Sequence, residues 1–345
     1  MEKAPAPSWA GAFSIGDEKK GKMRGFRYQA TAIVVALAAC VACASCKPGS
    51  PWLLSYQAGN YSLTSITAAD ASHVWTIGAG HVFFFDGNDW ARQADLPGDV
   101  SSISAGDATH VWASGAAGSP QAGAPLGGVI YFYDGSKWNK QFESGDRSID
   151  VVAAHGAKNA WAAGWTGSGG NLYHFDGNAW SPAGAVGHVQ DIKVLGDNKA
   201  LLVQESQDRS SQVIVFDGKS WSSFYTADTT RLGITTAGLS AIWTVGGSAG
   251  KGESSIEKMS WSKTGPITTF NVPDFLTKVA AADTSHVWAV GGTGYQGPIY
   301  FFDGKTWARQ YAGGEPLFSV CATGPKKAWA CGSLGAIYSY SPGGR

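Results

Sequence analysis

Charged residues and long apolar runs are both scarce in this sequence. Only 15% of its 345 residues are charged, and 26 Lys and Arg residues balance 26 Asp and Glu residues. A nucleic-acid-binding domain usually carries a basic stripe, which this composition does not supply. The apolar run from Ala30 to Ala39 is well short of the roughly 20 residues that cross a bilayer. We therefore expect no nucleic-acid partner and no permanent membrane-spanning helix.

Familiar catalytic signatures are also absent from the sequence. It has no P-loop, zinc-ligand spacing, Ser-His-Asp order or nucleophile elbow, and we expect neither a cofactor nor a metal. Glycine and tryptophan are abundant instead, at 47 and 15 residues, and 44% of the chain is apolar. Such a chain can bury a large core, and the absence of helical apolar spacing after the N-terminus indicates many short strands. The composition predicts an all-β protein.

The N-terminal segment has the layout of an export signal. Residues 24–46 read "RGFRYQATAIVVALAACVACASC", which places two arginines before an apolar stretch and then small residues. "LAAC" at 37–40 resembles the bacterial lipobox, where cleavage precedes a cysteine that receives a lipid. The resemblance implies a signal peptide over residues 1–39, a lipidated Cys40, a tether over residues 40–50 and a membrane-anchored lipoprotein of the bacterial envelope.

Other interpretations of this segment stay open. An ordinary cleaved signal would leave Cys40 unmodified, and a start at Met23 would shorten the signal to 17 residues. Val41 after the cysteine fits export to the outer membrane. Cys43 and Cys46 complete a C-x2-C-x2-C spacing that echoes an iron–sulfur site, but no fourth cysteine follows at the required distance. We interpret these two cysteines as bystanders or alternative lipidation points.

A motif of ten residues recurs seven times along the rest of the chain. It ends in Trp in six copies and in Leu201 in the fourth, and the intervals between these last residues are 37, 49, 40, 42, 45 and 41. The copies are "ITAADASHVW" (66–75), "ISAGDATHVW" (103–112), "VAAHGAKNAW" (152–161), "IKVLGDNKAL" (192–201), "ITTAGLSAIW" (234–243), "VAAADTSHVW" (279–288) and "VCATGPKKAW" (320–329).

A second motif of the type "FDGxxW" follows most copies, as in "FDGNDW" (85–90). Asp-Gly between two β runs predicts a tight hairpin with a primed turn. Each unit then has four strands, A to D, with D starting at the second tryptophan. Strand C is apolar at consecutive positions, as in "VFFF", which is typical of a strand covered on both faces. Sheets stacked around an axis meet this condition, so the repeats predict a β-propeller.

The ring is predicted to close through the N-terminus. The seventh unit lacks strand D, whereas "SPWLLSYQAG" (50–59) precedes the first unit, with Trp52 fourteen residues before Ile66. In five of the other units the D-strand tryptophan precedes the next unit by 12 to 14 residues, namely Trp90, Trp138, Trp180, Trp221 and Trp307. We therefore predict seven four-stranded blades over residues 51–341, with the N-terminal strand completing the last.

At this point the chain resembles the kelch-like and WD40/YVTN/BNR-like bacterial propellers. The kelch features are Gly246-Gly247 and Gly291-Gly292 at the end of strand B. An aromatic residue also lies seven positions before the D-strand tryptophan, as in Tyr131 and Trp138. The resemblance implies the architecture and says little about activity.

Two repeated features could be functional or structural. His73, His110 and His286 share one position, each three residues after an aspartate. We interpret them as parts of Asp-initiated turns rather than metal or acid–base groups, because copies on separate blades do not converge. The repeated tryptophans are interpreted as wedges between blades rather than as an aromatic cage. Cys321 and Cys331 would lie nearly opposite in a symmetric hairpin, which makes them a disulfide candidate.

The loops on the two faces of the predicted propeller differ in how much their lengths vary. The A–B and C–D turns are short and alike, whereas the B–C and D–A loops, which share the other face, vary in length and composition. Variable loops on a rigid scaffold are where binding sites are built. The variable segments are 115–128, 164–170, 204–212, 247–255 and 264–275. The residues that we expect to contact a ligand on this face are Trp165, Arg147, Arg209, Arg231, Tyr295 and Gln296.

These residues predict a monomeric binding or scaffold protein that recognises an envelope protein or a glycan. The alternative is a sialidase-like, glycan-active enzyme in which Arg147, Arg209 and Arg231 clamp a carboxylate. Tyr225, Glu143 or Asp208 would then supply the chemistry. A copper oxidase would need converging tyrosines and histidines, and only His81 and His188 start near this face.

Overall fold

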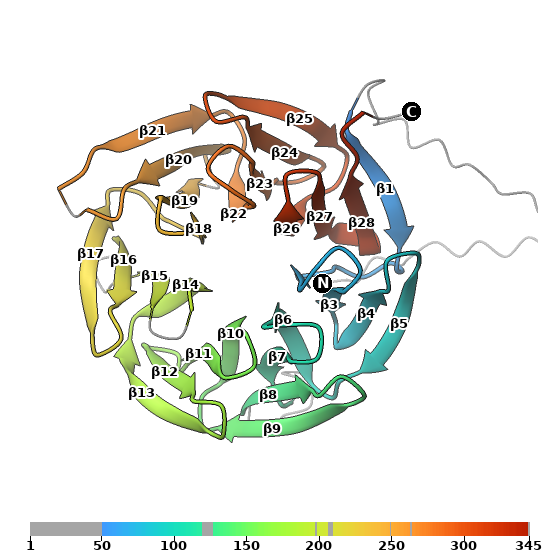
Figure 1. Cartoon of the computed structure of the whole chain (residues 1–345), viewed down its shortest axis with the longest axis vertical. Helices are drawn as coiled ribbons and strands as arrows, with labels where there is room; N and C mark the ends of the chain where they lie inside the picture. The colour runs from blue at the N-terminus through green and yellow to red at the C-terminus, as the bar shows by residue number, and fades with distance from the viewer. Residues whose placement is uncertain are drawn as a thin grey trace, which may run out of the picture. The chain divides into compact units, whose positions relative to one another are not determined.

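The structure is a computed structural model that describes residues 50–118, 127–196, 199–205, 210–248, 250–262 and 264–343. The chain divides into two compact units, Met1–Ala42 and Cys43–Arg345, and all described residues belong to the second. In this unit, seven four-stranded antiparallel sheets stand in a ring (Figure 1). The predicted all-β, seven-bladed propeller is therefore confirmed, and the described residues contain only one helical segment, η2 (Ser333–Gly335).

Each blade runs outward from strand A at the channel to strand D at the rim (Figure 1). Blade 1 comprises β2 (Ser65–Ala68), β3 (Val74–Gly78), β4 (His81–Phe85) and β5 (Trp90–Asp95). Blade 2 comprises β6 (Asp99–Ala105), β7 (Val111–Ala116), β8 (Gly128–Tyr133) and β9 (Trp138–Ser144). Blade 3 comprises β10 (Ser148–His155), β11 (Asn159–Trp165), β12 (Gly170–Phe175) and β13 (Trp180–Val186).

The remaining blades follow the same order. Blade 4 comprises β14 (His188–Val194), β15 (Ala200–Glu205), β16 (Ser211–Phe216) and β17 (Trp221–Ala227). Blade 5 comprises β18 (Gly233–Ala237), β19 (Ala241–Ser248), β20 (Glu253–Met259) and β21 (Ile267–Val272). Blade 6 comprises β22 (Leu276–Ala281), β23 (Val287–Gly291), β24 (Gly297–Phe302) and β25 (Trp307–Gly313). Blade 7 comprises β26 (Leu317–Gly324), β27 (Lys327–Gly332), β28 (Ala336–Tyr340) and, as its outer strand, β1 (Trp52–Gln57).

The N-terminal strand closes the ring, as predicted. β1 pairs antiparallel with β28, with Trp52 opposite Tyr340. The indole Nε1 of Trp52 also donates a hydrogen bond of 3.2 Å to Gln310 Oε1 in blade 6. The last blade is thus completed by residues from the opposite end of the described chain.

The B-strand tryptophans fill the space between neighbouring blades. Trp243 in blade 5, for example, packs against Phe302 of blade 6 with 4.8 Å between ring centroids, and both belong to one buried cluster. The six tryptophans at this repeat position are all buried: Trp75, Trp112, Trp161, Trp243, Trp288 and Trp329. Their burial confirms the interpretation of these tryptophans as wedges.

Hydroxyl side chains link the innermost strands of blades 7, 1, 2 and 3. Strand A is the free edge of each sheet, so half of its N–H groups have no partner within the blade. The Ile103 N–H donates to Ser65 Oγ of the preceding blade at 3.3 Å, and the Val152 N–H donates to Ser102 Oγ at 3.2 Å. Serine side chains of these A strands therefore accept hydrogen bonds from N–H groups at the free edge of the next blade.

The Asp-Gly turns form the predicted hairpins, but the aspartate does not take the positive φ that we expected. Phe85 pairs with Trp90, so the loop between strands C and D has four residues. Gly87 has a positive φ of 100°, whereas Asp86 is not among the residues with positive φ. The Asp86 carboxylate instead accepts the backbone N–H groups of Asn88 and Asp89 at 2.8 and 2.9 Å. The aspartate shapes the turn through its side chain rather than through its own backbone conformation.

Blade 5 departs from the predicted boundaries. We expected strand D to start at Trp261, but β21 starts at Ile267 and lies inside the segment 264–275 that we predicted as a loop. This unit has lost the Asp-Gly pair, so no tight turn brings strand D in directly after strand C. The ring of Trp261 packs near Phe224 of blade 4, with 6.5 Å between centroids.

Candidate functional site

The two faces of the ring differ, because antiparallel strands place the B–C and D–A loops on one face and the A–B and C–D turns on the other. We call the former the loop face and the latter the turn face. A cavity of about 380 Å³ lies in the central channel and is lined by the seven A strands. Strand A begins at the loop face, so the first residues of each A strand surround the channel mouth on that side.

Blades 3 and 4 bring aromatic and titratable groups together at this mouth. His188 is the first residue of β14, and its Nε2 lies 3.4 Å from Asp150 Oδ2 on β10. The ring of Trp165, at the end of β11, packs against His188 with 4.4 Å between ring centroids and the two rings tilted by 42°. All three side chains are partly exposed. The mouth therefore offers an aromatic surface next to a carboxylate that can accept hydrogen bonds.

Neighbouring polar groups fix this arrangement. Ser148 Oγ donates to Asp150 Oδ1, and Gln190 Nε2 lies 3.1 Å from His188 Nδ1. Because an amide nitrogen only donates, Nδ1 of neutral His188 is the acceptor, which leaves the proton on Nε2, 3.4 Å from Asp150 Oδ2. The sequence placed His188 near this face, but we did not predict a role for Asp150 or Gln190. The available signal was a set of charged and long polar side chains in strand A, where most blades carry serine, threonine or alanine.

Arg147 adds a positive charge beside this group. It lies in the D–A loop before β10, and its side chain is exposed. Its backbone N–H donates to the carbonyl oxygen of Trp165 at 2.8 Å. Its guanidinium packs against Gly167, where a Cβ atom would lie 3.1 Å from the Arg147 Cζ. The structure thus brings together two of the predicted ligand-contacting residues, Arg147 and Trp165, on the loop face.

Further down the channel, one ion pair joins three blades. Lys278 Nζ of blade 6 lies 2.9 Å from Asp191 Oδ1 of blade 4. The other oxygen of Asp191 accepts the N–H of Ile234 in blade 5 at 2.9 Å. Asp191 therefore takes the linking role that serine and threonine have elsewhere, and it also holds a cation in the channel wall.

Arg231 is not available for the three-arginine clamp of the sialidase-like alternative. Arg231 is only 2% exposed, and its Nη2 donates to Glu257 Oε1 at 2.6 Å. This placement corrects the expectation that Arg231 is displayed on the loop face, because its guanidinium is engaged inside the ring. Arg209 and Asp208 lie outside the described residues, so the structure does not test them.

Tyr295 and Gln296 are both exposed, in the B–C loop of blade 6. The Tyr295 side chain is 84% exposed, the highest value among the large apolar and aromatic residues of the described chain. The loop is tight, since a Cβ atom on Gly292 would lie 1.7 Å from Gln296 O, and Gly292 has a φ of 131°. The backbone therefore presents Tyr295 at a fixed place, and its ligand contact stays a prediction.

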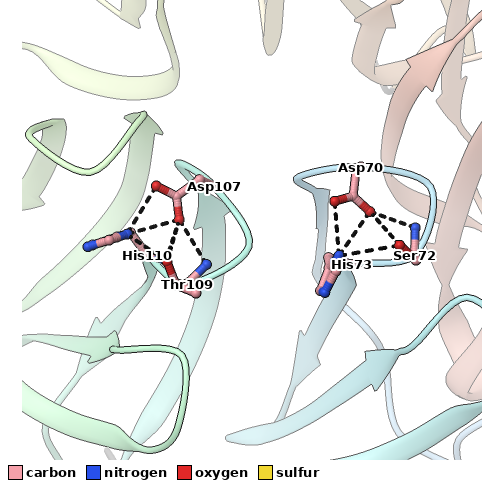
Figure 2. Close-up of polar contacts among 6 residues, drawn as sticks. All are labelled: Asp70, Ser72, His73, Asp107, Thr109 and His110. Atoms are coloured by element: carbon pink, nitrogen blue, oxygen red, sulfur yellow. Dashed lines mark hydrogen bonds and ion pairs between the residues drawn. The ribbon is translucent and has the colours of Figure 1, made fainter.

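The histidines at the repeated position lie on the turn face. Figure 2 shows two of the A–B turns, in which the aspartate carboxylate contacts the residues two and three positions later in the chain. In blade 1, Asp70 Oδ1 accepts the N–H and hydroxyl of Ser72 at 2.7 and 2.9 Å. His73 Nδ1 lies 2.9 Å from Asp70 Oδ2. This geometry confirms the predicted Asp-initiated turn.

Hydrogen bonding sets the charge state of these aspartates. Partial burial of the carboxyl acts to raise the pKa of Asp70, but hydrogen bonds from the Ser72 N–H, the His73 ring and the Ser72 hydroxyl outweigh it and lower the pKa to about 2. The serine donates to the aspartate and not toward a substrate position, and the histidine uses its Nδ1 within the turn. These residues serve the fold of the turn rather than nucleophilic catalysis.

The repeated tyrosines of strand C hold the D–A loops of blades 3 and 6 in place. The Tyr173 hydroxyl donates to Asp146 Oδ2 at 2.6 Å, and Tyr300 donates to Asp274 Oδ2 at 2.5 Å. Both aspartates are buried in the D–A loops just before strand A. Asp146 directly precedes Arg147, so this contact helps to position the predicted ligand residue. The sequence showed the tyrosine repeat but not its partner.

The disulfide expected between Cys321 and Cys331 is not formed, and both thiols are free. A bulge between Ala322 and Gly324 shifts the hairpin register, so Cys321 faces Trp329 and Cys331 faces Ser319. Diagonal neighbours in a sheet are roughly 7–8 Å apart, too far for a disulfide. Burial raises the pKa of Cys331 to about 12 and also raises that of Cys321.

The predicted lipidation residue Cys40 lies outside the described residues, and so do the signal peptide and most of the tether. Within the described part of the chain, no helix is long and apolar enough to cross a membrane. The same residues contain no group of three or more His, Cys, Asp or Glu side chains that could hold a metal ion.

Comparison with known proteins establishes the fold class alone. No family model and no curated protein sequence matches the chain. A solved structure of "YCF48 bound to D1 peptide" is 14% identical, with a TM-score of 0.63, 86% of this chain covered and 99% of the other. The WD40 propeller of Doa1 is 12% identical, with a TM-score of 0.63 and coverages of 85% and 97%. The SapL1 lectin in complex with α-methyl fucoside is 12% identical, with a TM-score of 0.56 and coverages of 74% and 97%. The chain is thus a β-propeller similar in fold to these solved structures.

Proposed function

We propose that this protein is a non-catalytic binding propeller that recognises an envelope protein or a glycan through its loop face. The observation that carries this proposal is the group formed by Trp165, His188, Asp150 and Arg147 at the channel mouth. It combines an aromatic surface, a hydrogen-bond acceptor and a cation on one open edge. Such a mixture suits recognition of a mixed polar and apolar ligand.

The contrast between the two faces supports this assignment. The turn face repeats the same Asp-initiated turns, whose polar groups bond to each other. The loop face carries the side chains that differ from blade to blade. Binding of a peptide is named for the YCF48 structure and binding of a fucoside for the SapL1 lectin. Ligands of both classes are therefore compatible with this fold.

We further propose that the protein is exported as a lipoprotein, anchored through Cys40 and monomeric. Mass spectrometry of the mature N-terminus tests the anchor: diacylglyceryl-modified Cys40 is expected, and an unmodified first residue other than Cys40 would refute it. The sialidase-like alternative gains no support, because the buried pair with Glu257 removes Arg231 from an open clamp.

The binding function is tested by capture of envelope proteins and by glycan arrays with the purified chain. Trp165→Ala should weaken capture at least tenfold without changing the unfolding midpoint, because the tryptophan is partly exposed at the mouth. Lys305→Ala on the turn face is the matched control and should bind like the parent. Equal binding by the Trp165→Ala variant would place recognition elsewhere, and turnover of a glycan substrate would refute a non-catalytic role.

A further inference from the structure

Blade 5 replaces a core residue by a buried arginine. Arg231 lies three residues before the first residue of the ten-residue repeat, and it is 2% exposed. At the same position every other blade carries an apolar residue that is at most 4% exposed. These residues are Leu63, Val100, Ile149, Val189, Leu276 and Leu317.

The partner of Arg231 is a second substitution in the same core. Glu257 lies opposite Thr244 in the sheet, where strand C of the other blades carries an aromatic residue or isoleucine. Glu257 is 6% exposed, and it accepts both Arg231 Nη2 at 2.6 Å and the Tyr225 hydroxyl at 3.2 Å. The equivalent residues are Phe83, Tyr131, Tyr173, Ile214, Tyr300 and Tyr338.

This ion pair is not a requirement of the fold. Removing two charges from water costs about as much as their attraction returns, and well-packed apolar residues are often as stable or more so. Six blades form without the pair. Its presence in one blade therefore indicates a task that apolar packing cannot perform.

A cavity of about 480 Å³ lies beside the pair on the loop face. Arg231 Nη2 donates to Thr229 Oγ1 at 2.8 Å, and its Nη1 donates to Ser255 O at 2.9 Å. Thr229 and Ser255 both line the cavity. The Nε of Arg231 is buried and has no hydrogen-bond partner. The guanidinium thus stands directly behind the cavity wall and fixes two lining residues.

The lining favours a neutral ligand with many hydroxyl groups. Lys251 and Glu253 carry opposite charges, and Glu257 balances Arg231, so the cavity selects neither anions nor cations. Thr229 and Asn271 can both donate and accept hydrogen bonds, Lys251 donates and Glu253 accepts, which together match sugar hydroxyls. Val272 and Pro273 provide a small apolar wall for the C–H face of a ring. The volume lies within the usual range for small-ligand sites.

We propose that this cavity binds one sugar residue of a glycan, with the Arg231–Glu257 pair positioning Thr229 and Ser255 for its hydroxyls. The inference rests on the proposed binding function and specifies the ligand class. Arg231 and Glu257 are positioning residues here, because neither lines the cavity.

The test uses the double variant Arg231→Leu/Glu257→Tyr, which gives blade 5 the residue types that other blades carry at these two positions. Its unfolding midpoint should equal or exceed that of the parent, since leucine and tyrosine are what other blades use at these positions. Binding to an array of immobilised glycans should fall at least tenfold. Competition by free glucose, galactose, mannose, fucose and N-acetylglucosamine identifies the sugar. Lys305→Ala is the matched control and should bind like the parent.

A second variant keeps the test decisive if the double variant fails to fold. Asn271→Ala changes an exposed residue of the cavity and should also weaken glycan binding at least tenfold. Unchanged glycan binding by a folded double variant, or by Asn271→Ala, overturns the inference. A parent that captures an envelope protein through Trp165 but binds no glycan also overturns it, while leaving the proposed binding function intact. A parent that captures neither class of ligand refutes the proposed function itself.

Discussion

The indole Nε1 of Trp52 donates to Gln310 Oε1 at 3.2 Å and so joins the N-terminal strand to blade 6, across 258 positions of sequence. The same contact recurs between Trp138 and Gln93, at 3.0 Å in blades 2 and 1. In both cases a D-strand tryptophan reaches the D strand of the preceding blade. The closing strand therefore uses the contact that joins ordinary neighbours, although it comes from the start of the described chain.

Replacing Trp52 should weaken the closed ring. Trp52 is fully buried, and truncation of a buried tryptophan to alanine usually costs about 3–5 kcal/mol. We expect Trp52→Ala to lower the free energy of unfolding by this amount, measured by urea denaturation. The control Leu53→Ala changes an exposed residue of the same strand and should stay within about 0.5 kcal/mol of the parent. Similar losses for both variants would contradict the closing role of Trp52.

The Asp-initiated turns should make stability depend on acid pH. The folded chain lowers the pKa of Asp70 and Asp283 to about 2 and also lowers that of Asp107. A carboxyl whose pKa is lower when folded stabilises the protein above its unfolded pKa, near roughly 4, and loses that contribution as the pH falls through the folded pKa. We expect urea midpoints to drop between pH 4 and pH 2. The variant Asp70→Asn/Asp107→Asn/Asp283→Asn should show a smaller drop, and an unchanged drop would argue against these turns.

The two cysteines of blade 7 should be unreactive in the folded protein. Burial raises the pKa of both thiols, and the thiolate is the reactive form. We expect iodoacetamide at pH 8 to leave Cys321 and Cys331 unlabelled until urea is added, as measured by peptide mass mapping. A peptide pair linked by a disulfide in the non-reduced digest would contradict this expectation, because it would show that the two thiols can approach and react.

The buried tyrosine–aspartate contact should contribute measurably to stability. The Tyr300 hydroxyl donates to Asp274 at 2.5 Å, and both side chains are buried. Loss of a hydrogen bond to a charged group costs about 1.5–3 kcal/mol. We expect Tyr300→Phe to lower the free energy of unfolding by this amount. Tyr133→Phe is the control, because its hydroxyl bonds to Gly135 O at the exposed surface, and its effect should stay below about 0.5 kcal/mol.

The repeat period and the closing strand could be predicted from sequence because both depend on local signals. Every blade needs the same wedge, so tryptophan returns at one position, and the missing seventh D strand matches the spare strand at residues 50–59. The boundary of β21 could not be predicted in this way. Without an Asp-Gly pair, tertiary pairing with β20 alone decides where that strand begins.

The sequence by itself determined the all-β class, the seven blades and the closure by β1, because each follows from periodicity and turn chemistry. Only the tertiary structure decided which side chains meet. A single bulge separated Cys321 from Cys331, and packing between blades buried Arg231 against Glu257. Trp165 and His188 lie 23 positions apart in sequence, yet their rings are in contact at the channel mouth. Such contacts depend on register and on neighbouring blades, which local sequence patterns do not record.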